Sequence, residues 1–274
     1  MIASARMYAV TPAVGLLWRH LLEGIAQRAG QAVDILDWPP PLPLAELWNK
    51  PDKAAVFMCG LPFSLASPQP EPVAAPVLAL PRSHGQPVYW SELVVRADST
   101  FRQLSDTFGH KIAFTTPESQ SGYAGPLHHL MQSARDKPLY REIIAPRITP
   151  YDALIAVTEG LADVAPIDSW ALALMRRHAP ELTAQIRIVA STEPTPIPLL
   201  ICSEGNGRLL NGVFDAAHED PALKSVMEEL LIERFVRPQP DAYFILKQRF
   251  ETARKFWQRQ PLAETTAPGA EVFR

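Results

Sequence analysis

Residues 111–125 carry the sequence KIAFTTPESQSGYAG, which passes from a short apolar run through hydroxyl-bearing residues and glycine into a helical pattern. This order predicts a strand, a polar loop and the start of a helix. Backbone N–H groups at the start of a helix lack partners within it, and together with Ser and Thr hydroxyl groups they favour an anion. The segment therefore indicates a binding site for a small anionic molecule.

Strand-like and helix-like segments alternate along the chain, which predicts an α/β fold with helices covering mostly parallel sheets. At the start, a strand at 5–10 precedes Thr11 as a helix N-cap and Pro12 as the first helical residue. The other predicted strands are 32–36, 54–59, 74–80, 88–96, 111–114, 142–145, 163–165, 186–190 and 198–202. The predicted helices are 12–30, 123–134, 150–158, 169–177, 207–218, 222–235 and 241–258. Residues from 262 onward are expected to form a loose tail.

The length of 274 residues predicts two domains, since one domain takes about 150 residues. Two proline-marked crossings, near 87–91 and 191–198, delimit an inserted part of the chain. We therefore expect lobe 1 to comprise 1–89 with 191–274, including the C-terminal helices. Lobe 2 then comprises 90–190 and carries the Ser-x-Ser-Gly loop, with a cleft between the two lobes.

The composition narrows the classes of partner. With 47% hydrophobic residues, 20% charged residues and a net charge of -3, the chain offers no electrostatic reason to bind nucleic acid or an anionic membrane. No run approaches the roughly 20 apolar residues that span a bilayer. Pro12 interrupts the one candidate for an export signal. We expect a cytoplasmic protein if the chain is complete as written, and a periplasmic one if an export signal was removed.

No metal site and no cofactor are expected from the sequence. Cys59 and Cys202 stand far apart, which favours two buried, unlinked thiols over a zinc motif. His128 and His129 are neighbours on a predicted helix and therefore face different directions. Phosphate-loop, HExxH and GxSxG motifs are absent from the sequence. Ser121 has no neighbouring sequence signal for a general base, so nucleophilic catalysis is not indicated.

The loop itself has two interpretations. The hydroxyl groups of Thr115, Thr116, Ser119 and Ser121 surround the helix start, and several neutral donors can hold an oxyanion without a bound cation. Alternatively, the same residues form an N-cap and a turn, with Gly122 supplying backbone freedom.

The segments YWSELVVRADS, GHKIAFTTPESQSGY and AVTEGLADVAPIDSWALALMRRHAPEL resemble, in this order, the phosphate/phosphonate-type periplasmic substrate-binding family of ABC transporters. Ser91 matches the family's strand into the second lobe, and Ser119, Ser121 and Gly122 match its Ser-x-Ser-Gly loop. The family's Gly-x-x-Asp-Val-x-x-x-Asp segment corresponds to Gly160, Asp163, Val164 and Asp168. The resemblance covers 88–202 and extends more weakly to the Cys59-Gly60 pair.

The resemblance implies a two-lobed type II periplasmic-binding-protein fold, with two mixed sheets flanked by helices and closure about a hinge. It also implies that Asp168 faces a cationic end of the ligand; the alternative is an N-cap for the helix at 169–177. Tyr123 and Trp90 either enclose the ligand or pack at the lobe junction. The ligand-binding residues expected on this basis are Tyr8, Thr11, Cys59, Gly60, Ser91, Thr115, Thr116, Ser119, Gln120, Ser121, Gly122, Tyr123, Thr149 and Asp168.

The sequence departs from the family at one place. Relatives often carry a Gly-Ser-His-like triplet before the helix that leads to the Asp-Val segment, and its histidine helps to hold the oxyanion. Here the corresponding residues are Ile148, Thr149 and Pro150, so that donor is missing. Thr149 still offers a hydroxyl group and a cap for the following helix, but a doubly charged phosphonate is less firmly indicated.

The leading hypothesis is a non-enzymatic protein that captures a small phosphonate-like or phosphate-like oxyanion, with the permease of an ABC importer as a possible partner. Two alternatives stay open. One is a cytoplasmic enzyme of cofactor biosynthesis with the same bilobal fold, which the lack of an evident acid/base pair opposes. The other is a ligand sensor that transmits closure of the cleft to a partner.

Overall fold

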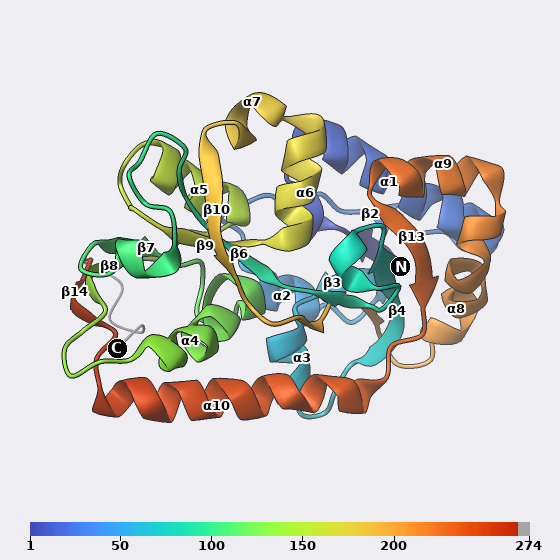
Figure 1. Ribbon diagram of the computed structural model, residues 1–274. Helices are drawn as coiled ribbons and strands as arrows, with labels where there is room; N and C mark the ends of the chain where they lie inside the picture. The colour runs from blue at the N-terminus through green and yellow to red at the C-terminus, as the bar shows by residue number, and fades with distance from the viewer. Residues whose placement is uncertain (268–274) are drawn as a thin grey trace. The chain divides into compact units, whose positions relative to one another are not determined.

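A computed structural model describes residues 1–267 of the chain (Figure 1). The described chain forms two compact units. Unit 1 contains Met1–Tyr89 and Pro196–Tyr243, and unit 2 contains Trp90–Thr195 together with residues 244–267 of the described chain. The chain therefore passes between the units three times, whereas two crossings were predicted. The strands β5 (Val88–Tyr89) and β11 (Thr195–Pro196) lie at the first two passages.

Unit 1 is built on a mixed sheet of six strands in the order β13-β4-β12-β3-β1-β2. Strand β1 is parallel to β2 and β3, whereas β12 is antiparallel to β3 and β4, and β13 is antiparallel to β4. The strands are β1 (Ile2–Ser4), β2 (Asp34–Ile35), β3 (Lys53–Met58), β4 (Glu71–Leu78), β12 (Leu199–Cys202) and β13 (Ile232–Val236). The helices of this unit are α1 (Pro12–Arg28), α2 (Leu44–Trp48), α3 (Gly60–Leu65), α8 (Gly207–Ala216) and α9 (Pro221–Glu229).

Two elements of unit 1 differ from the sequence prediction. The first strand ends at Ser4, because the chain turns where the Tyr8 N–H donates to the Ala5 carbonyl oxygen at 2.8 Å. The predicted strand at 5–10 is therefore wrong. The predicted helix at 222–235 ends early, since Leu231 adopts a left-handed φ of 59° and the chain then pairs with β4 as β13. Pairing with a distant strand overrides local helix preference there.

Unit 2 contains two three-stranded sheets. The strands of β10-β6-β9 are antiparallel, and those of β14-β8-β7 are parallel. A parallel bridge between Ile112 and Val164 joins β7 to the chain just before β9. The strands are β6 (Ser91–Arg96), β7 (Lys111–Ala113), β8 (Tyr140–Ile144), β9 (Ala165–Asp168), β10 (Ile186–Ser191) and β14 (Ala263–Thr266). The helices are α4 (Gly125–Leu130), α5 (Pro150–Thr158), α6 (Ser169–His178), α7 (Pro180–Thr183) and α10 (Phe244–Arg259).

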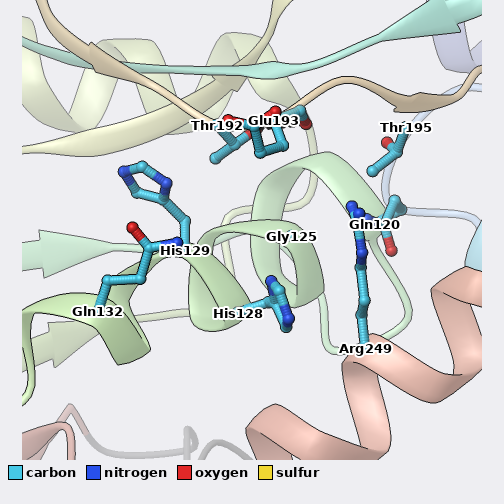
Figure 2. A pocket seen from close by; sticks show the side chains of 9 residues that line it. All are labelled: Gln120, Gly125, His128, His129, Gln132, Thr192, Glu193, Thr195 and Arg249. Carbon is cyan, nitrogen blue, oxygen red and sulfur yellow. Dashed lines mark hydrogen bonds between the residues drawn. The ribbon is translucent and has the colours of Figure 1, made fainter.

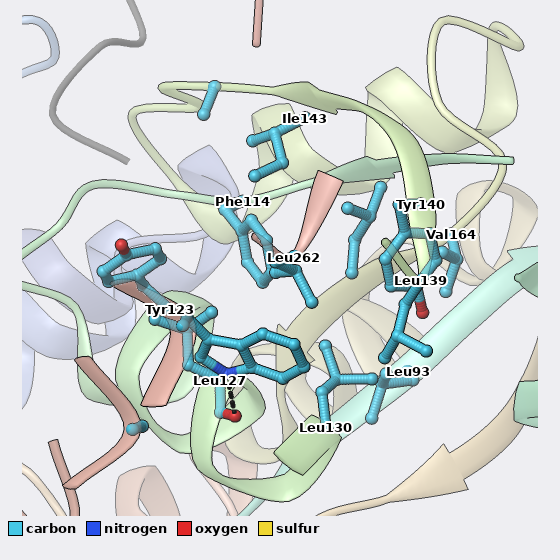
Figure 3. Packing of buried hydrophobic residues seen from close by; sticks show 14 of the residues in the cluster. Leu93, Phe114, Tyr123, Leu127, Leu130, Leu139, Tyr140, Ile143, Val164 and Leu262 are labelled. Carbon is cyan, nitrogen blue, oxygen red and sulfur yellow. Dashed lines mark hydrogen bonds between the residues drawn. The ribbon is translucent and has the colours of Figure 1, made fainter. Parts of the chain in front are cut away.

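The C-terminal helix α10 belongs to unit 2, so its predicted place in lobe 1 is wrong. Its buried residues Ala253 and Trp257 belong to the apolar core of unit 2. Figure 3 shows Leu127 and Leu130 of α4 in the same core. The indole Nε1–H of Trp257 also donates to the Leu127 carbonyl oxygen at 2.9 Å. Residues 263–266, predicted as part of a loose tail, form β14 beside β8. The remainder of that predicted tail, from 268 onward, lies outside the described residues.

None of the helices in residues 1–267 combines the length and the apolar character that crossing a membrane requires.

Replacing Trp257 with alanine tests the role of α10 in unit 2. The substitution removes a buried aromatic side chain, and comparable changes in protein cores cost about 3–5 kcal/mol in the free energy of unfolding. Urea denaturation monitored by circular dichroism measures this loss. Lys255→Ala on the exposed face of the same helix is the matched control and should change the free energy by less than about 0.5 kcal/mol. Equal effects of the two substitutions would contradict the placement of α10.

Candidate functional site

One edge of the unit 2 sheets gathers the candidate residues of this unit. The parallel strands β7 and β8 end there, as does β9, which runs parallel to β7 at the Ile112–Val164 bridge. Because β6 and β10 are antiparallel neighbours, β6 begins and β10 ends at this same edge. Ligands of open α/β sheets bind beside the carboxyl ends of the strands. The predicted site residues of unit 2 lie at this edge or follow it directly along the chain.

The loop after β7 folds around Ser119. A turn is closed by the Ser119 N–H, which donates to the Thr116 carbonyl oxygen at 3.0 Å. The Ser119 hydroxyl oxygen accepts from the Gly122 N–H at 3.0 Å and thereby caps the following helix. The Thr115 N–H donates to the Gly122 carbonyl oxygen at 3.1 Å, which ties both ends of the loop together. The predicted N-cap and turn are therefore present, and they do not decide whether an anion binds.

The helix that follows starts as a π-helix, η4 (Gln120–Ala124). The Ala124 N–H donates to the Ser119 carbonyl oxygen, and the Gly125 N–H donates to the Gln120 carbonyl oxygen, both five residues back. Helix α4 continues without a break from Gly125. Single π-helical turns are rare in proteins as a whole, and those that occur are often found at functional sites. The sequence pattern predicted a helix here but carried no signal for this wider turn.

Gly122 is required by close packing. A Cβ atom at this position would lie 1.9 Å from Oγ1 of Thr115 and 2.7 Å from its Cβ and Cγ2 atoms. Thr115 is buried, and its hydroxyl group has no hydrogen-bond partner among the described residues. The Thr115 side chain therefore lies directly beneath the first turn of η4. Any larger residue at 122 would push the loop away from β7.

A buried chain of hydrogen bonds links the helix start to the sheet. The Ser91 hydroxyl group donates to the Ser121 carbonyl oxygen at 2.6 Å, and the Ser121 hydroxyl group donates to Asp168 Oδ2 at 3.1 Å. Ser91 and Asp168 are direct partners in the pairing of β6 with β9. The Ser91 N–H also donates to the Thr192 hydroxyl oxygen at 2.9 Å. The sequence thus identified three residues that the fold brings together, and it missed Thr192.

Asp168 caps helix α6. Its Oδ1 atom accepts from the N–H groups of Trp170 at 2.9 Å and Ala171 at 3.0 Å, while Oδ2 accepts from Ser121. The side chain is only 5% exposed. The capping interpretation of Asp168 is therefore confirmed, and contact with a cationic ligand group stays a prediction.

The two aromatic candidates pack inside unit 2. The Tyr123 ring meets the Phe114 ring edge-on at 5.5 Å, and burial raises the pKa of Tyr123 to about 12. Trp90 is buried, and its indole N–H donates to Glu92 Oε1 at 2.6 Å. Both contacts agree with a packing role.

Thr149 follows β8 at the same edge and caps α5. Its hydroxyl oxygen accepts from the Asp152 N–H, and the Asp152 carboxylate accepts from the Thr149 N–H, both at 3.0 Å. The predicted cap is confirmed. Thr149 is partly exposed, and its contact with a ligand stays a prediction.

The four candidates of unit 1 lie at one edge of its own sheet. Tyr8 and Thr11 follow β1, and Cys59 and Gly60 follow β3, which is the parallel neighbour of β1. The buried Tyr8 ring meets the Phe57 ring edge-on at 5.2 Å, and the Thr11 hydroxyl oxygen caps α1 by accepting from Val14 N–H at 3.2 Å. Cys59 is the buried N-cap residue of α3. Each pair thus connects a strand end to a helix start.

Unit 2 also contains a pocket beside η4 (Figure 2). Its cavity volume is about 50 Å³, and the space around it, which includes open solvent, amounts to about 380 Å³. Gln120 and the α4 histidines His128 and His129 line it, together with Glu193 from the segment after β10 and Arg249 from α10. Of these residues, only Gln120 was expected at a ligand site. Arg249 was not predicted as a site residue, because nothing in the sequence pattern of α10 indicates that this helix packs against unit 2.

Both histidines have lowered pKa values. Burial is the main cause for each, and the neighbouring Arg249 guanidinium adds to the effect at His128. The Glu193 carboxylate works in the opposite direction at His129. Within the described chain, no group of three His, Cys, Asp or Glu side chains is arranged to hold a metal ion.

Comparison with known proteins gives a consistent result. The sequence model of the family described as "ABC transporter, phosphonate, periplasmic substrate-binding protein" matches residues 55–243, which is well over half of the chain. It reaches beyond the 88–202 range of the resemblance noted from the motifs. No curated protein matches the chain by sequence.

Solved structures with the same fold include a binding protein component of an ABC phosphonate transporter from Pseudomonas aeruginosa, with a TM-score of 0.77 and 18% identity over 93% of this chain and 86% of that chain. For PhnD1 from Prochlorococcus marinus in complex with methylphosphonate, the TM-score is 0.74 and the sequence identity is 13%, over 93% of this chain and 97% of that chain. For a Xanthomonas citri protein bound to ATP, the TM-score is 0.59 and the sequence identity is 17%, over 94% of this chain and 98% of that chain. These likenesses show an α/β periplasmic-binding-protein-like fold of type II, as predicted.

A double-mutant cycle tests the packing of Thr115 beneath Gly122. Gly122→Ala alone should lower the free energy of unfolding by about 1–3 kcal/mol, because the added methyl group overlaps Thr115. Thr115→Ala removes two of the three overlapping atoms, so the pair should be less destabilising than the sum of the single changes by about 0.5–3 kcal/mol. Urea denaturation of all four proteins measures the coupling. Gly212→Ala in α8, where a Cβ meets nothing within 4 Å, is the control and should stabilise by up to about 1 kcal/mol. Strict additivity would show that the two residues are not in contact.

Proposed function

Because the chain belongs to the family of periplasmic substrate-binding proteins of phosphonate ABC transporters, we propose that it binds a small phosphonate-like oxyanion at the start of η4 and serves an ABC importer. A phosphonate is the first choice of ligand, since the Prochlorococcus relative was solved with methylphosphonate. Phosphate presents similar oxygen atoms and is the second choice. Binding, and no catalysis, is the proposed activity.

The hydrogen bonds of the loop are the observation that carries this proposal. Ser91 and Ser121 already donate their hydroxyl protons to protein oxygen atoms. Thr116 and Ser119 are partly exposed residues, and the hydroxyl group of neither donates to another described residue. Ser119 accepts from Gly122, so its own proton is available to an anion. Thr116 and Ser119 are therefore the proposed hydroxyl donors, and Ser91 and Ser121 hold the loop in shape.

The backbone adds further donors at the same place. The first N–H groups of a helix lack partners within it and carry the positive end of its dipole. Gln120–Leu130 forms one continuous helical segment through η4 and α4, with Ser119 as its cap. Together with two hydroxyl groups, these N–H groups would satisfy several oxygen atoms of one phosphonate group. Hydrogen bonds to a charged acceptor are stronger than neutral ones.

The same contacts argue against a catalytic serine. Ser121 is the only candidate nucleophile of the loop with a carboxylate neighbour, Asp168. That carboxylate already accepts from two backbone N–H groups as the cap of α6. The pair therefore has a structural use, because it joins the start of η4 to the cap of α6.

Isothermal titration calorimetry with methylphosphonate tests the proposal, with inorganic phosphate and acetate for comparison. Ser119→Ala should weaken methylphosphonate binding about tenfold or more, which matches the loss of one hydrogen bond to a charged group. Ser99→Ala is the matched control. It removes a partly buried serine whose hydroxyl group donates to the Arg96 carbonyl oxygen at 2.8 Å, beyond the opposite end of β6. This variant should bind like the parent protein.

Thermal melts of the ligand-free variants separate a lost contact from a lost cap, since removing a helix cap costs about 1 kcal/mol on its own. If the parent protein bound neither methylphosphonate nor phosphate, the proposed ligand class would be wrong. If Ser119→Ala bound methylphosphonate as tightly as the Ser99 variant, the loop would not be the anion site.

A further inference from the structure

The pocket beside η4 contains a guanidinium group that no described residue neutralises. Arg249 reaches into the pocket from α10 (Figure 2). It is partly buried, and it makes no hydrogen bond or ion pair of its own within residues 1–267. An arginine side chain stays charged at any physiological pH and offers five N–H donors in a planar fork that matches a carboxylate or a phosphate. Its position favours an external anionic partner.

The other titratable groups of the pocket do not neutralise the positive charge of Arg249. The pKa values of His128 and His129 are lowered, so both imidazole rings are mainly neutral near pH 7. Glu193 also lines the pocket, but it is not within 4.0 Å of the Arg249 guanidinium, and its charge acts on His129. In Figure 2 Arg249 extends toward Gln120 and Thr195, while Glu193 lies beside Thr192. An acidic group would therefore find its complement at the Arg249 end.

Gln120 connects the pocket to the proposed anion loop. Gln120 lines the pocket and is the residue directly after Ser119. A Cβ atom at Gly125 would lie 3.0 Å from the Gln120 carbonyl oxygen and 3.1 Å from its Nε2 atom, so the Gln120 side chain lies close along the helix at this glycine. Thr192, on another wall of the pocket, accepts a hydrogen bond from Ser91 of the buried chain that holds η4. A ligand group extending past Gln120 would enter this pocket.

We propose that Arg249 binds a second acidic group of the ligand, so that the substrates are small phosphonates carrying a carboxylate or another anionic group. This inference rests on the proposed function, because it takes the first phosphonate group to lie at the η4 loop. The loop supplies neutral donors for that group, and the pocket supplies one full positive charge for the second. Methylphosphonate would fill only the first position.

Isothermal titration calorimetry with paired ligands tests the inference. Methylphosphonate carries one acidic group, whereas phosphonoacetate and 2-carboxyethylphosphonate add a carboxylate at two different distances. The parent protein should bind one of the two carboxylated ligands about tenfold or more tightly than methylphosphonate, as expected for a charge-assisted hydrogen-bonded pair. Arg249→Gln should abolish this preference by weakening the carboxylated ligand, with a much smaller change for methylphosphonate.

Lys247→Gln is the matched control. It removes the same charge from an exposed position of α10, two residues before Arg249, and should keep the preference. If Arg249→Gln kept the preference, or if the parent protein showed none while binding methylphosphonate, the Arg249 site would be refuted and the proposed function would stand. If the parent protein bound no phosphonate of the set, the Arg249 site would be refuted, and the proposed function would fail with it only if inorganic phosphate did not bind either.

Discussion

The hydrogen bond from the Ser91 hydroxyl group to the Ser121 carbonyl oxygen is the interaction on which the candidate site depends. It is buried, and it joins the first residue of β6 to the first turn of η4. The next link, from Ser121 to Asp168, connects that turn to the end of β9 and the start of α6. Buried polar groups of this kind are costly unless every member is satisfied, and a satisfied network fixes one geometry. The loop that follows β7 is therefore held by two further strands, β6 and β9.

This network explains why the sequence motifs point to residues that the fold brings together, while giving incomplete roles for them. The Ser-x-Ser-Gly pattern and the Asp-Val segment located Ser119, Ser121 and Asp168, because a polar residue after a short apolar strand indicates a strand end. The partners of each hydroxyl group depend on side chains from other strands, and spacing along the chain carries no information about them. The π-helical turn and the overlap of Thr115 with Gly122 are likewise set by packing.

The fold class was predictable because apolar strands and amphipathic helices alternate with clear caps, and Thr149 with Pro150 fixed the start of α5 as expected. The membership of α10 was not predictable. Its apolar residues show that one face is buried, but the same pattern fits any apolar partner. The packing of Ala253 and Trp257 in the core of unit 2, with the hydrogen bond from Trp257 to Leu127, selects this unit. Since Arg249 lies on this helix, the error in assigning the helix also hid the one arginine of the pocket.

The division between neutral and charged donors has a physical rationale. Hydroxyl and backbone groups can be buried beside a sheet edge at modest cost when no ligand is present, whereas a buried cation without a partner is costly. A partly exposed arginine in an open pocket keeps much of its hydration and loses little while the pocket is empty. The arginine would form a charge-assisted hydrogen bond with a second acidic group of the ligand. A ligand without that group would leave the guanidinium hydrated. Under our proposals, recognition of the oxyanion would therefore depend on the fixed loop. Discrimination between oxyanions would depend on the partly exposed side chain of Arg249.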